Sequence, residues 1–300
     1  MLLNYYRRWK FALAAGPLGR VWREEVRPAR RVARARGQLR GLGRRLADVA
    51  YLLRLERVVF FLQFGLGFAL AAPRWDLADL RLLVLAIVCL GPCLYGGLYA
   101  LNDAADAAAD RLSPAKRRRP VAAGRISPLA ARRLGMALVL TGLGLALLLD
   151  ERVFALGLAF AAINILYTHV FKHVRWLDLI FNAITHPLRL GGGLWLGGGL
   201  THWPLLAVWA LICLANSGVK RLYELHTAPP ASRPVLRRYT APQLMRLLAA
   251  CQGAALGLCL CLFLPPVELV LAGAALLWSL AVVLGYRWPI AARVVALFGR

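Results

Sequence analysis

The sequence has little negative charge and no long polar stretch. Its 300 residues include 14 Asp or Glu against 38 Lys or Arg, which gives a formal net charge of +24. A protein that binds DNA or RNA would carry such an excess on a folded soluble module. The chain has no segment that could form one, so we expect no nucleic-acid partner, and the positive charge needs another explanation.

The sequence also lacks the cysteine spacing of metal and redox motifs. Its six cysteines fall inside apolar runs, and no pair is separated by the two residues typical of zinc or redox sites. The apolar run near the start is too short and too interrupted for a secretory signal, so no cleaved signal is expected. We interpret the cysteines as small residues of the core or of the lipid-facing surface.

Apolar residues dominate what is present. They make up 60% of the chain, and the mean hydropathy is +0.60, well above that of ordinary soluble domains. Repeated apolar runs near the length of a spanning helix predict an all-α, polytopic membrane helix bundle of eight transmembrane helices. Eight spans are expected, at 58–73, 80–101, 127–149, 152–171, 176–199, 203–222, 241–264 and 267–286.

The cations are distributed unevenly between the loops. With the N-terminus in the cytoplasm, nearly every Lys and Arg between the spans falls on the cytoplasmic side, as the positive-inside rule requires. Residues 1–57 hold 15 of these cations and are expected to form a basic amphipathic segment on an anionic membrane surface, or else a disordered tail. The expected organisation is this segment, a transmembrane domain over 58–286, and a basic cytoplasmic tail over 287–300.

Three aspartates and an asparagine form a stripe in LNDAADAAADRLSPAKRRRP, residues 101–120. If the second span continues to residue 110, helical spacing puts the four side chains within about a quarter turn. Carboxylates so close repel one another unless a cation lies between them, and Mg²⁺ shared with substrate phosphates is the usual solution. The alternative is a solvated helix end whose aspartates pair with Arg111, Lys116 or Arg117. The intervening alanines argue against it, because small side chains let a ligand or a neighbouring helix approach closely. The predicted Mg²⁺ ligands are Asn102, Asp103, Asp106 and Asp110.

Arg189 lies near the middle of the apolar run 176–199. An arginine at this depth is costly unless it faces a polar cavity or a counter-ion. Three glycines follow it directly, which suits close helix approach or a broken helix beside a ligand. We therefore predict that Arg189 faces a central cavity that holds phosphate.

Together with two later stretches, the aspartate stripe gives the sequence a family resemblance. The pattern Asn-Asp-x-x-Asp-x-x-x-Asp (102–110) resembles the first signature of the UbiA superfamily of intramembrane prenyltransferases. The Ser-Pro-x-Lys-Arg-x-Arg-Pro tail (113–120) and the stretches 167–193 and 218–244 resemble its polyprenyl-phosphate phosphoribosyltransferase branch, which makes decaprenyl-phosphoryl-5-phosphoribose. That branch also opens its first span with a longer pattern, of which only Arg54 is present here.

The resemblance implies a UbiA-like fold, which usually has nine spans, although the tail after residue 286 is too short and basic for an ordinary ninth. It also implies Mg²⁺-dependent transfer of 5-phosphoribosyl from phosphoribosyl diphosphate to a polyprenyl phosphate, with release of diphosphate. Members that use a prenyl diphosphate generally carry a second acidic motif, and this chain has Lys220-Arg221-x-x-Glu224 instead. One acid with two cations is a poor metal site but a good clamp for a phosphate. The aspartates would then hold the diphosphate through Mg²⁺, while Lys220 and Arg221, with Lys172, bind the 5-phosphate.

The resulting site assignments fall into two groups. Catalytic roles are expected for Asp103, Asp106, Asp110, Lys220 and Arg221. Substrate-binding roles are expected for Asn102, Lys116, Arg117, Arg119, Tyr167, Lys172, Arg189 and Glu224. The protein is expected in a bacterial inner membrane, with its N-terminus and its site on the cytoplasmic side.

Two other functions stay open. A prenyltransferase that moves a prenyl group from its diphosphate to an aromatic or other small acceptor would use the same aspartates, but would need an acidic second site. A non-enzymatic carrier or lipid-binding protein whose aspartates gate an ion would need a polar pathway across the bilayer. The polar residues inside the predicted spans cluster towards one side instead.

Overall fold

The structure is a computed structural model, and the regular secondary structure of its described part is all helical, with no strand. The chain divides into two units, Met1–Val49 and Ala50–Arg300. The expected tail over 287–300 and most of the expected interfacial segment lie outside the described residues. Those are 41–72, 74–113, 116–199, 201–227, 234–262 and 264–285.

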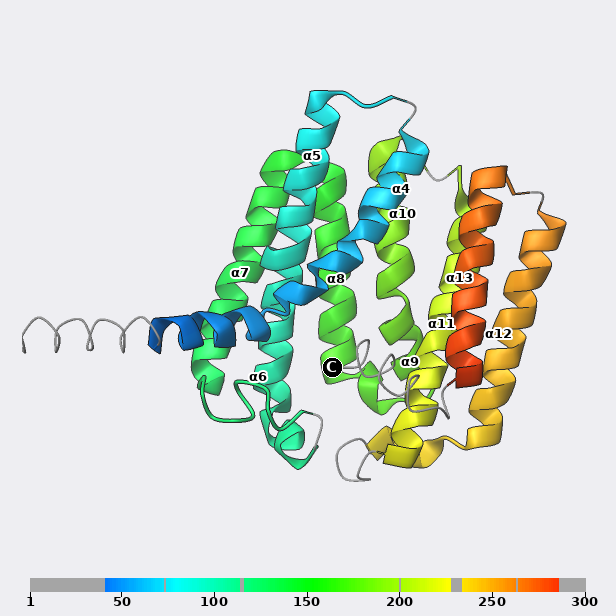
Figure 1. Cartoon of the computed structure of the whole chain (residues 1–300). Helices are drawn as coiled ribbons and strands as arrows, with labels where there is room; N and C mark the ends of the chain where they lie inside the picture. Colours follow the sequence, from blue (N-terminus) through cyan, green and yellow to red (C-terminus); the bar gives the residue numbers. More distant parts are fainter. Residues whose placement is uncertain are drawn as a thin grey trace, which may run out of the picture. The chain divides into compact units, whose positions relative to one another are not determined.

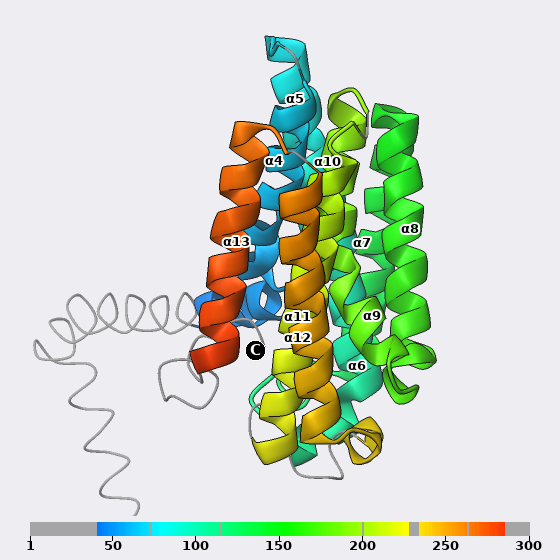
Figure 2. The same ribbon diagram turned by 90° about the vertical axis from the view of Figure 1, so that its right-hand side faces the viewer.

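The first unit is helical over its described residues, 41–49. The second unit is a bundle of helices that stand side by side (Figures 1 and 2). Its α-helices are α4 (Leu62–Ala71), α5 (Leu77–Val88), α6 (Gly96–Leu112), α7 (Pro128–Leu149), α8 (Glu151–His169), α9 (Leu177–Ala183), α10 (Thr185–Gly197), α11 (Trp203–Thr227), α12 (Ala241–Cys261) and α13 (Pro266–Gly285). Short helices of other types are η2 (Leu55–Phe61), η3 (Cys89–Tyr95), η4 (Phe171–His173) and η6 (Pro234–Arg238).

Six helices of the described part are long and apolar enough to cross a membrane. They cover Leu77–Leu112, Pro128–Leu149, Glu151–His169, Trp203–His226, Ala241–Cys261 and Pro266–Val283. The other two expected spans correspond to shorter helices, α4 and the broken pair α9–α10, so the count of eight crossings stays a prediction. The first of the six continues well beyond residue 101, the expected end of the second span, which places the whole aspartate stripe on one helix.

That long helix is continuous from α5 through η3 to α6. Its middle section, η3, is a π-helix with Pro92 inside it. Proline has no N–H to donate and its ring clashes with the preceding turn. Although π turns are rare, they occur mostly as single turns inside α-helices, and here the helix continues through the interruption.

Polar capping residues mark where the apolar helices begin. At the start of α5 the Asp76 carboxylate accepts a hydrogen bond from the Asp79 N–H, and the Asp79 carboxylate accepts one from the Asp76 N–H. The Ser127 hydroxyl accepts from the Ala130 N–H before α7, and the Asp150 carboxylate accepts from the Arg152 N–H before α8. Such caps satisfy the free N–H groups of a first turn.

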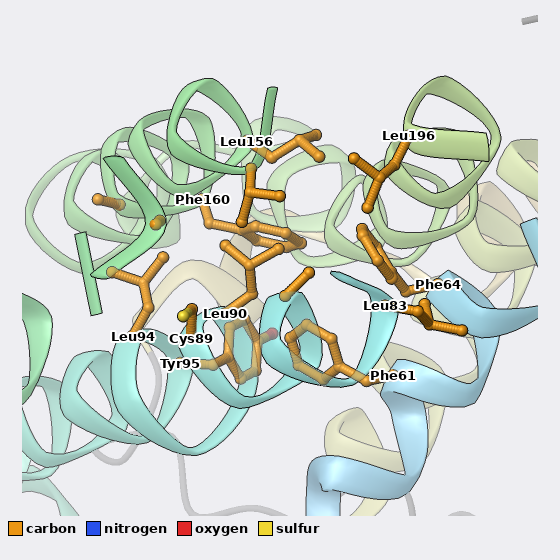
Figure 3. Close-up of a cluster of buried hydrophobic side chains, with 14 of the residues drawn as sticks. Phe61, Phe64, Leu83, Cys89, Leu90, Leu94, Tyr95, Leu156, Phe160 and Leu196 are labelled. Atoms are coloured by element: carbon orange, nitrogen blue, oxygen red, sulfur yellow. The ribbon is translucent and has the colours of Figure 1, made fainter. Parts of the chain in front are cut away.

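Aromatic and branched side chains fill the space between α4, η3 and α8 (Figure 3). Phe61 stacks edge-on against Tyr95 with ring centroids 6.0 Å apart, and Tyr95 does the same with Phe160 at 5.9 Å. This cluster packs η2 and α4 against η3, the segment that leads into the aspartate-bearing helix.

Helices α4 and α10 approach each other through glycines. Gly193 and Gly197 of α10 lie against the backbone of Phe64 and Phe68 in α4, without room for a Cβ. Small residues of this kind let helices approach closely inside a membrane. The expected close approach of the glycines after Arg189 is thus present at Gly193.

Replacing Gly193 with alanine is expected to destabilise the bundle by about 1–3 kcal/mol or more, because the new methyl group would meet the Phe64 carbonyl oxygen. The matched control is Gly253→Ala in α12, where a Cβ meets nothing within 4 Å and where alanine is the better helix former. Thermal unfolding in detergent should show a lower midpoint for the first variant only. Equal midpoints for both would contradict the packing described here.

The helix ends that carry the predicted motifs lie together. Figure 1 shows the C-terminal end of α6, the N-terminal end of α9 and the C-terminal end of α11 at the same end of the bundle, and Figure 2 agrees. Residues that are more than a hundred positions apart in the sequence can therefore share one site.

Candidate active site

The aspartates of α6 occupy one helix face but differ in burial. Asp103 and Asp110 are buried, with exposed fractions of 1% and 3%, whereas the side chain of Asp106 is 23% exposed. Asn102 is half-buried, and its side-chain oxygen accepts a hydrogen bond from the Thr168 hydroxyl at 3.1 Å. Asp106 is thus the carboxylate of the three that a ligand can reach most easily.

Cations from two other segments, the connection between α6 and α7 and the short helix η4, contact these carboxylates. Arg119 donates to Asp103 at 3.0 Å and to Asp110 at 2.8 Å, and so joins the two buried aspartates. Lys172 of η4 contacts Asp106 at 2.5 Å. Lys116 lies 3.8 Å from Asp110. The repulsion between neighbouring carboxylates is therefore balanced by cations of the chain itself.

Arg54 is a further partner of Asp103. Its guanidinium lies 3.3 Å from the carboxylate, and both side chains are almost fully buried. The backbone of Arg54 has a φ of 53°, in the left-handed region that side chains rarely adopt. Although residues up to 57 were expected to belong to the N-terminal segment, Arg54 is part of the bundle and of its polar centre.

Arg119 lies in the connection between α6 and α7. Burial acts to lower the pKa of Arg119, but the carboxylates of Asp103 and Asp110 outweigh it, so that the pKa is raised above its usual value. The guanidinium therefore stays charged and can hold anionic groups at this end of α6.

A second ionic cluster surrounds Arg221 on α11. Its guanidinium has no exposed surface and donates to Asp178 of α9 at 2.6 Å and to Glu224 at 2.8 Å. The Tyr239 hydroxyl donates to the other Asp178 oxygen, and the Trp176 N–H donates to that hydroxyl at 2.9 Å. Arg221 thus ties α9 to α11, and Tyr239 joins the segment before α12 to the same aspartate.

Tyr239 lies outside the membrane-spanning helices, between η6 and α12. Burial raises the pKa of Tyr239, and its hydrogen bond to Asp178 raises it further. The phenol therefore remains protonated and acts as a hydrogen-bond donor to the carboxylate over the physiological pH range.

A cavity of about 460 Å³ is lined by residues of η2, α4, η3, α6, α9, α10, α11 and α13, among them Tyr95 and Tyr99. Arg189, predicted to face such a cavity, lines it together with Lys220. The Arg189 guanidinium is buried over the Tyr95 ring at 4.4 Å and over the Phe61 ring at 5.1 Å, in cation–π contacts.

The structure brings most of the predicted site residues together in three groups. Asp103, Asp106, Asp110, Lys116, Arg119 and Lys172 form the group at the end of α6, with Asn102 beside them. Lys220 and Arg189 share the cavity, and Arg221 pairs with Glu224. Arg117 is exposed, and Tyr167 is half-buried on α8. Their roles in binding and catalysis stay predictions.

Sequence reasoning missed Asp178 and Tyr239, and it gave no role to Arg57, which lines the cavity. A signal existed for Asp178, because an acid inside an apolar run predicts a buried partner. Tyr239 falls within the stretch 218–244 that resembles the family branch, but nothing in the sequence indicated its partner, which lies 61 positions away.

The described residues contain no cluster of three or more His, Cys, Asp or Glu arranged to hold a metal ion. The donor chemistry still fits Mg²⁺, because carboxylate and amide oxygens are its preferred protein ligands. In the described arrangement Lys172 and Arg119 occupy oxygens that a metal would use.

Apolar helices around a buried ionic centre define an integral membrane protein. Residues 58–226 match the model of the UbiA prenyltransferase family, and the chain belongs to this family. The fold agrees: a UbiA homologue from Archaeoglobus fulgidus, solved with GPP and Mg²⁺ bound, superposes with a TM-score of 0.68 at 18% identity, over 84% of this chain and 98% of that one.

Curated relatives match over shorter stretches. The decaprenyl-phosphate phosphoribosyltransferase of Corynebacterium glutamicum is 33% identical over 161 residues, which are 51% of this chain and 47% of the relative. The nodulation protein NoeC of Azorhizobium caulinodans is 33% identical over 150 residues, 49% of this chain and 46% of the relative. The chain thus spans about half the length of the curated relatives it matches.

Proposed function

We propose that the protein transfers 5-phosphoribosyl from phosphoribosyl diphosphate to a polyprenyl phosphate and releases diphosphate. The proposal rests on the composition of the motif Lys220-Arg221-x-x-Glu224. Lys220 lines the cavity, and the acid of that motif, Glu224, is paired with Arg221. A second metal site on a prenyl diphosphate would need free acids there, whereas cations suit a phosphate that no metal neutralises. The phosphoribosyltransferase relative supports the same reaction.

In this proposal Asn102, Asp103, Asp106 and Asp110 would hold Mg²⁺, which would bind the diphosphate of the donor. Mg²⁺ bound there would neutralise the negative charge that develops on the departing diphosphate. Lys172 and Arg119 exchange their carboxylate partners for phosphate oxygens when the donor binds. Lys116 and Arg117 extend this positive region at the end of α6.

The chemistry needs no nucleophile from the protein. The bond between C1 of the ribose and the diphosphate oxygen breaks, and its electron pair leaves with the diphosphate. An oxygen of the anionic polyprenyl phosphate forms the new bond to C1. The chain contributes by orienting both substrates and by placing cations where charge develops.

The location proposed for the protein is a bacterial inner membrane, with the aspartates on the cytoplasmic side. The support is the distribution of Lys and Arg between the loops. Residues 1–57 would lie on the anionic surface of the same leaflet. Both substrates would then meet at the cytoplasmic end of the bundle.

The test is a transfer assay with the purified full chain in detergent. We expect a lipid-linked ribose phosphate to form from labelled phosphoribosyl diphosphate, a polyprenyl phosphate and Mg²⁺, and to be absent when EDTA replaces Mg²⁺. A parallel reaction contains a prenyl diphosphate and an aromatic acid in place of these substrates. It is included because a UbiA homologue was solved with GPP bound. Product from that second pair alone would establish prenyl transfer instead.

A further inference from the structure

Lys172, the cation that contacts Asp106, lies on the short connection between α8 and α9, residues 170–176. One end of this connection is held beside the aspartates, because the Thr168 hydroxyl at the end of α8 donates to the asparagine of α6 at 3.1 Å. The position of Lys172 therefore depends on what holds the other end, at Trp176.

The backbone of Trp176 has an unusual conformation. Its φ is 71° and its ψ is −42°, in the region of positive φ that residues with a Cβ rarely adopt. Such a conformation persists only where the surrounding contacts enforce it, and it is found most often at functional sites. Trp176 directly precedes α9, so its conformation sets the angle at which the connection meets that helix.

Tyr239, from the segment before α12, makes contacts that hold Trp176 in place. The Trp176 N–H donates to the Tyr239 hydroxyl at 2.9 Å, and that hydroxyl donates to Asp178. The two rings pack edge to face with their centroids 5.4 Å apart, and the Arg175 guanidinium lies 4.6 Å from the centre of the Trp176 ring. Tyr239 therefore holds both the backbone and the ring of Trp176.

The two sequence neighbours of Lys172 are held as well. The Arg238 guanidinium lies 3.5 Å from the His173 carbonyl oxygen. The ring of Phe171 packs against that of Phe181, with centroids 4.1 Å apart. One neighbour is thus held by η6 and the other by α9, so the connection has little freedom of its own.

We propose that Tyr239 is a positioning residue for the site at the end of α6. It holds Trp176, and with it the connection 170–176, so that the Lys172 ammonium stays beside the aspartates and can take a phosphate oxygen of the donor. Tyr239 acts through Lys172 rather than by contact with a substrate. The inference rests on the proposed function only in treating Lys172 as a contact of the donor.

Tyr239→Phe tests the proposal, because it keeps the ring and removes only the hydroxyl. We expect the KM for the diphosphate donor to rise by about tenfold, the size of effect that one or two hydrogen bonds can have. A loosened connection must be ordered when the donor binds, which weakens binding. The bound complex then reacts as before, so kcat should stay within about threefold of its usual value.

A double variant separates positioning from general stabilisation of the bundle. Lys172→Gln should itself raise the KM for the donor by about tenfold or more. If Tyr239 acts through Lys172, the double variant Tyr239→Phe/Lys172→Gln should match Lys172→Gln alone. Independent effects would instead multiply to about a hundredfold or more.

Hydrogen exchange follows the connection without any substrate. In Tyr239→Phe the backbone amides of residues 170–176 should exchange faster, while those of α4 should be unchanged. The kinetic values are measured with whichever pair of substrates gives product in the transfer assay. Product from the prenyl pair alone would therefore reject the proposed reaction and still allow this proposal to be tested.

The matched control is Gln243→Ala, which removes a hydrogen bond of 3.2 Å to the Thr240 N–H at the start of α12 and leaves the Tyr239 hydroxyl in place. Both the KM and the exchange over 170–176 should be unchanged. Thermal unfolding verifies that each variant is folded at the assay temperature. An unchanged KM or unchanged exchange in Tyr239→Phe, a loss confined to kcat, multiplying effects in the double variant, or equal losses in the control would overturn the proposal.

Discussion

Replacing Asp106 with asparagine is expected to lower the rate of lipid-linked product formation by about a hundredfold or more. The substitution keeps the size of the side chain and removes its charge. Asp106 is the most exposed aspartate of the α6 face and its cation, Lys172, is partly exposed as well. It is therefore the carboxylate best placed to exchange a lysine for a metal ion and a diphosphate. The measurement is the initial rate of transfer at saturating phosphoribosyl diphosphate and Mg²⁺.

The matched control is Asp76→Asn at the start of α5. Asparagine is as good a helix cap as aspartate, so this variant should stay folded and keep its activity. The Asp106 variant should in addition lose the dependence of its thermal midpoint on Mg²⁺. A transfer rate within threefold of the unmodified protein would show that Asp106 contributes neither metal nor substrate binding.

Replacing Arg221 with methionine is expected to reduce the free energy of unfolding by about 3–5 kcal/mol. The variant leaves the Asp178 carboxylate buried without its guanidinium partner, because both side chains have no exposed surface. The double variant Arg221→Met/Asp178→Leu removes both charges and should regain much of the loss. With the single variant Asp178→Leu, thermal or denaturant unfolding in detergent gives the four values of a double-mutant cycle.

The control for that cycle is the pair formed by Asp150 and Arg152, whose side chains are 18% and 33% exposed. Arg152→Met should cost only about 0–1 kcal/mol, as is usual for exposed pairs. Activity then separates two roles for Arg221. A double variant that is stable and active would make Arg221 a positioning residue, whereas one that is stable and inactive would support the substrate contact expected from its motif. A small effect of Arg221→Met on stability would contradict the buried pair.

The helical bundle and the aspartate face were predictable because each depends on local pattern. Apolar runs of the right length specify the long helices, and a spacing of three or four residues places Asp103, Asp106 and Asp110 on one face. It was also predictable that Arg189 faces a cavity, because an arginine inside an apolar span is costly unless it faces a polar cavity or a counter-ion. These predictions needed no knowledge of which helices are neighbours.

The pairing of charges was less predictable. The aspartates were expected to be neutralised by a metal, with Arg111, Lys116 and Arg117 as the alternative partners. In the structure the cations closest to them are Arg119, Lys172 and Arg54. Arg54 and Lys172 lie 49 and 66 positions from their partners, so only the packing of η2 and η4 against α6 brings them there.

The π-helix η3 sets how α6, which bears the aspartates, is rotated relative to α5. A π turn contains one more residue than an α turn, and each residue of an α-helix advances the side chains by about 100°. Deleting a single residue between Cys89 and Tyr95 would turn α6 by that angle relative to α5. The aspartates and the cavity-lining Tyr99 would then point towards neighbouring helices or lipid, although all of these residues would still be present. The site therefore depends on how α6 is rotated about its axis as well as on the presence of the acids.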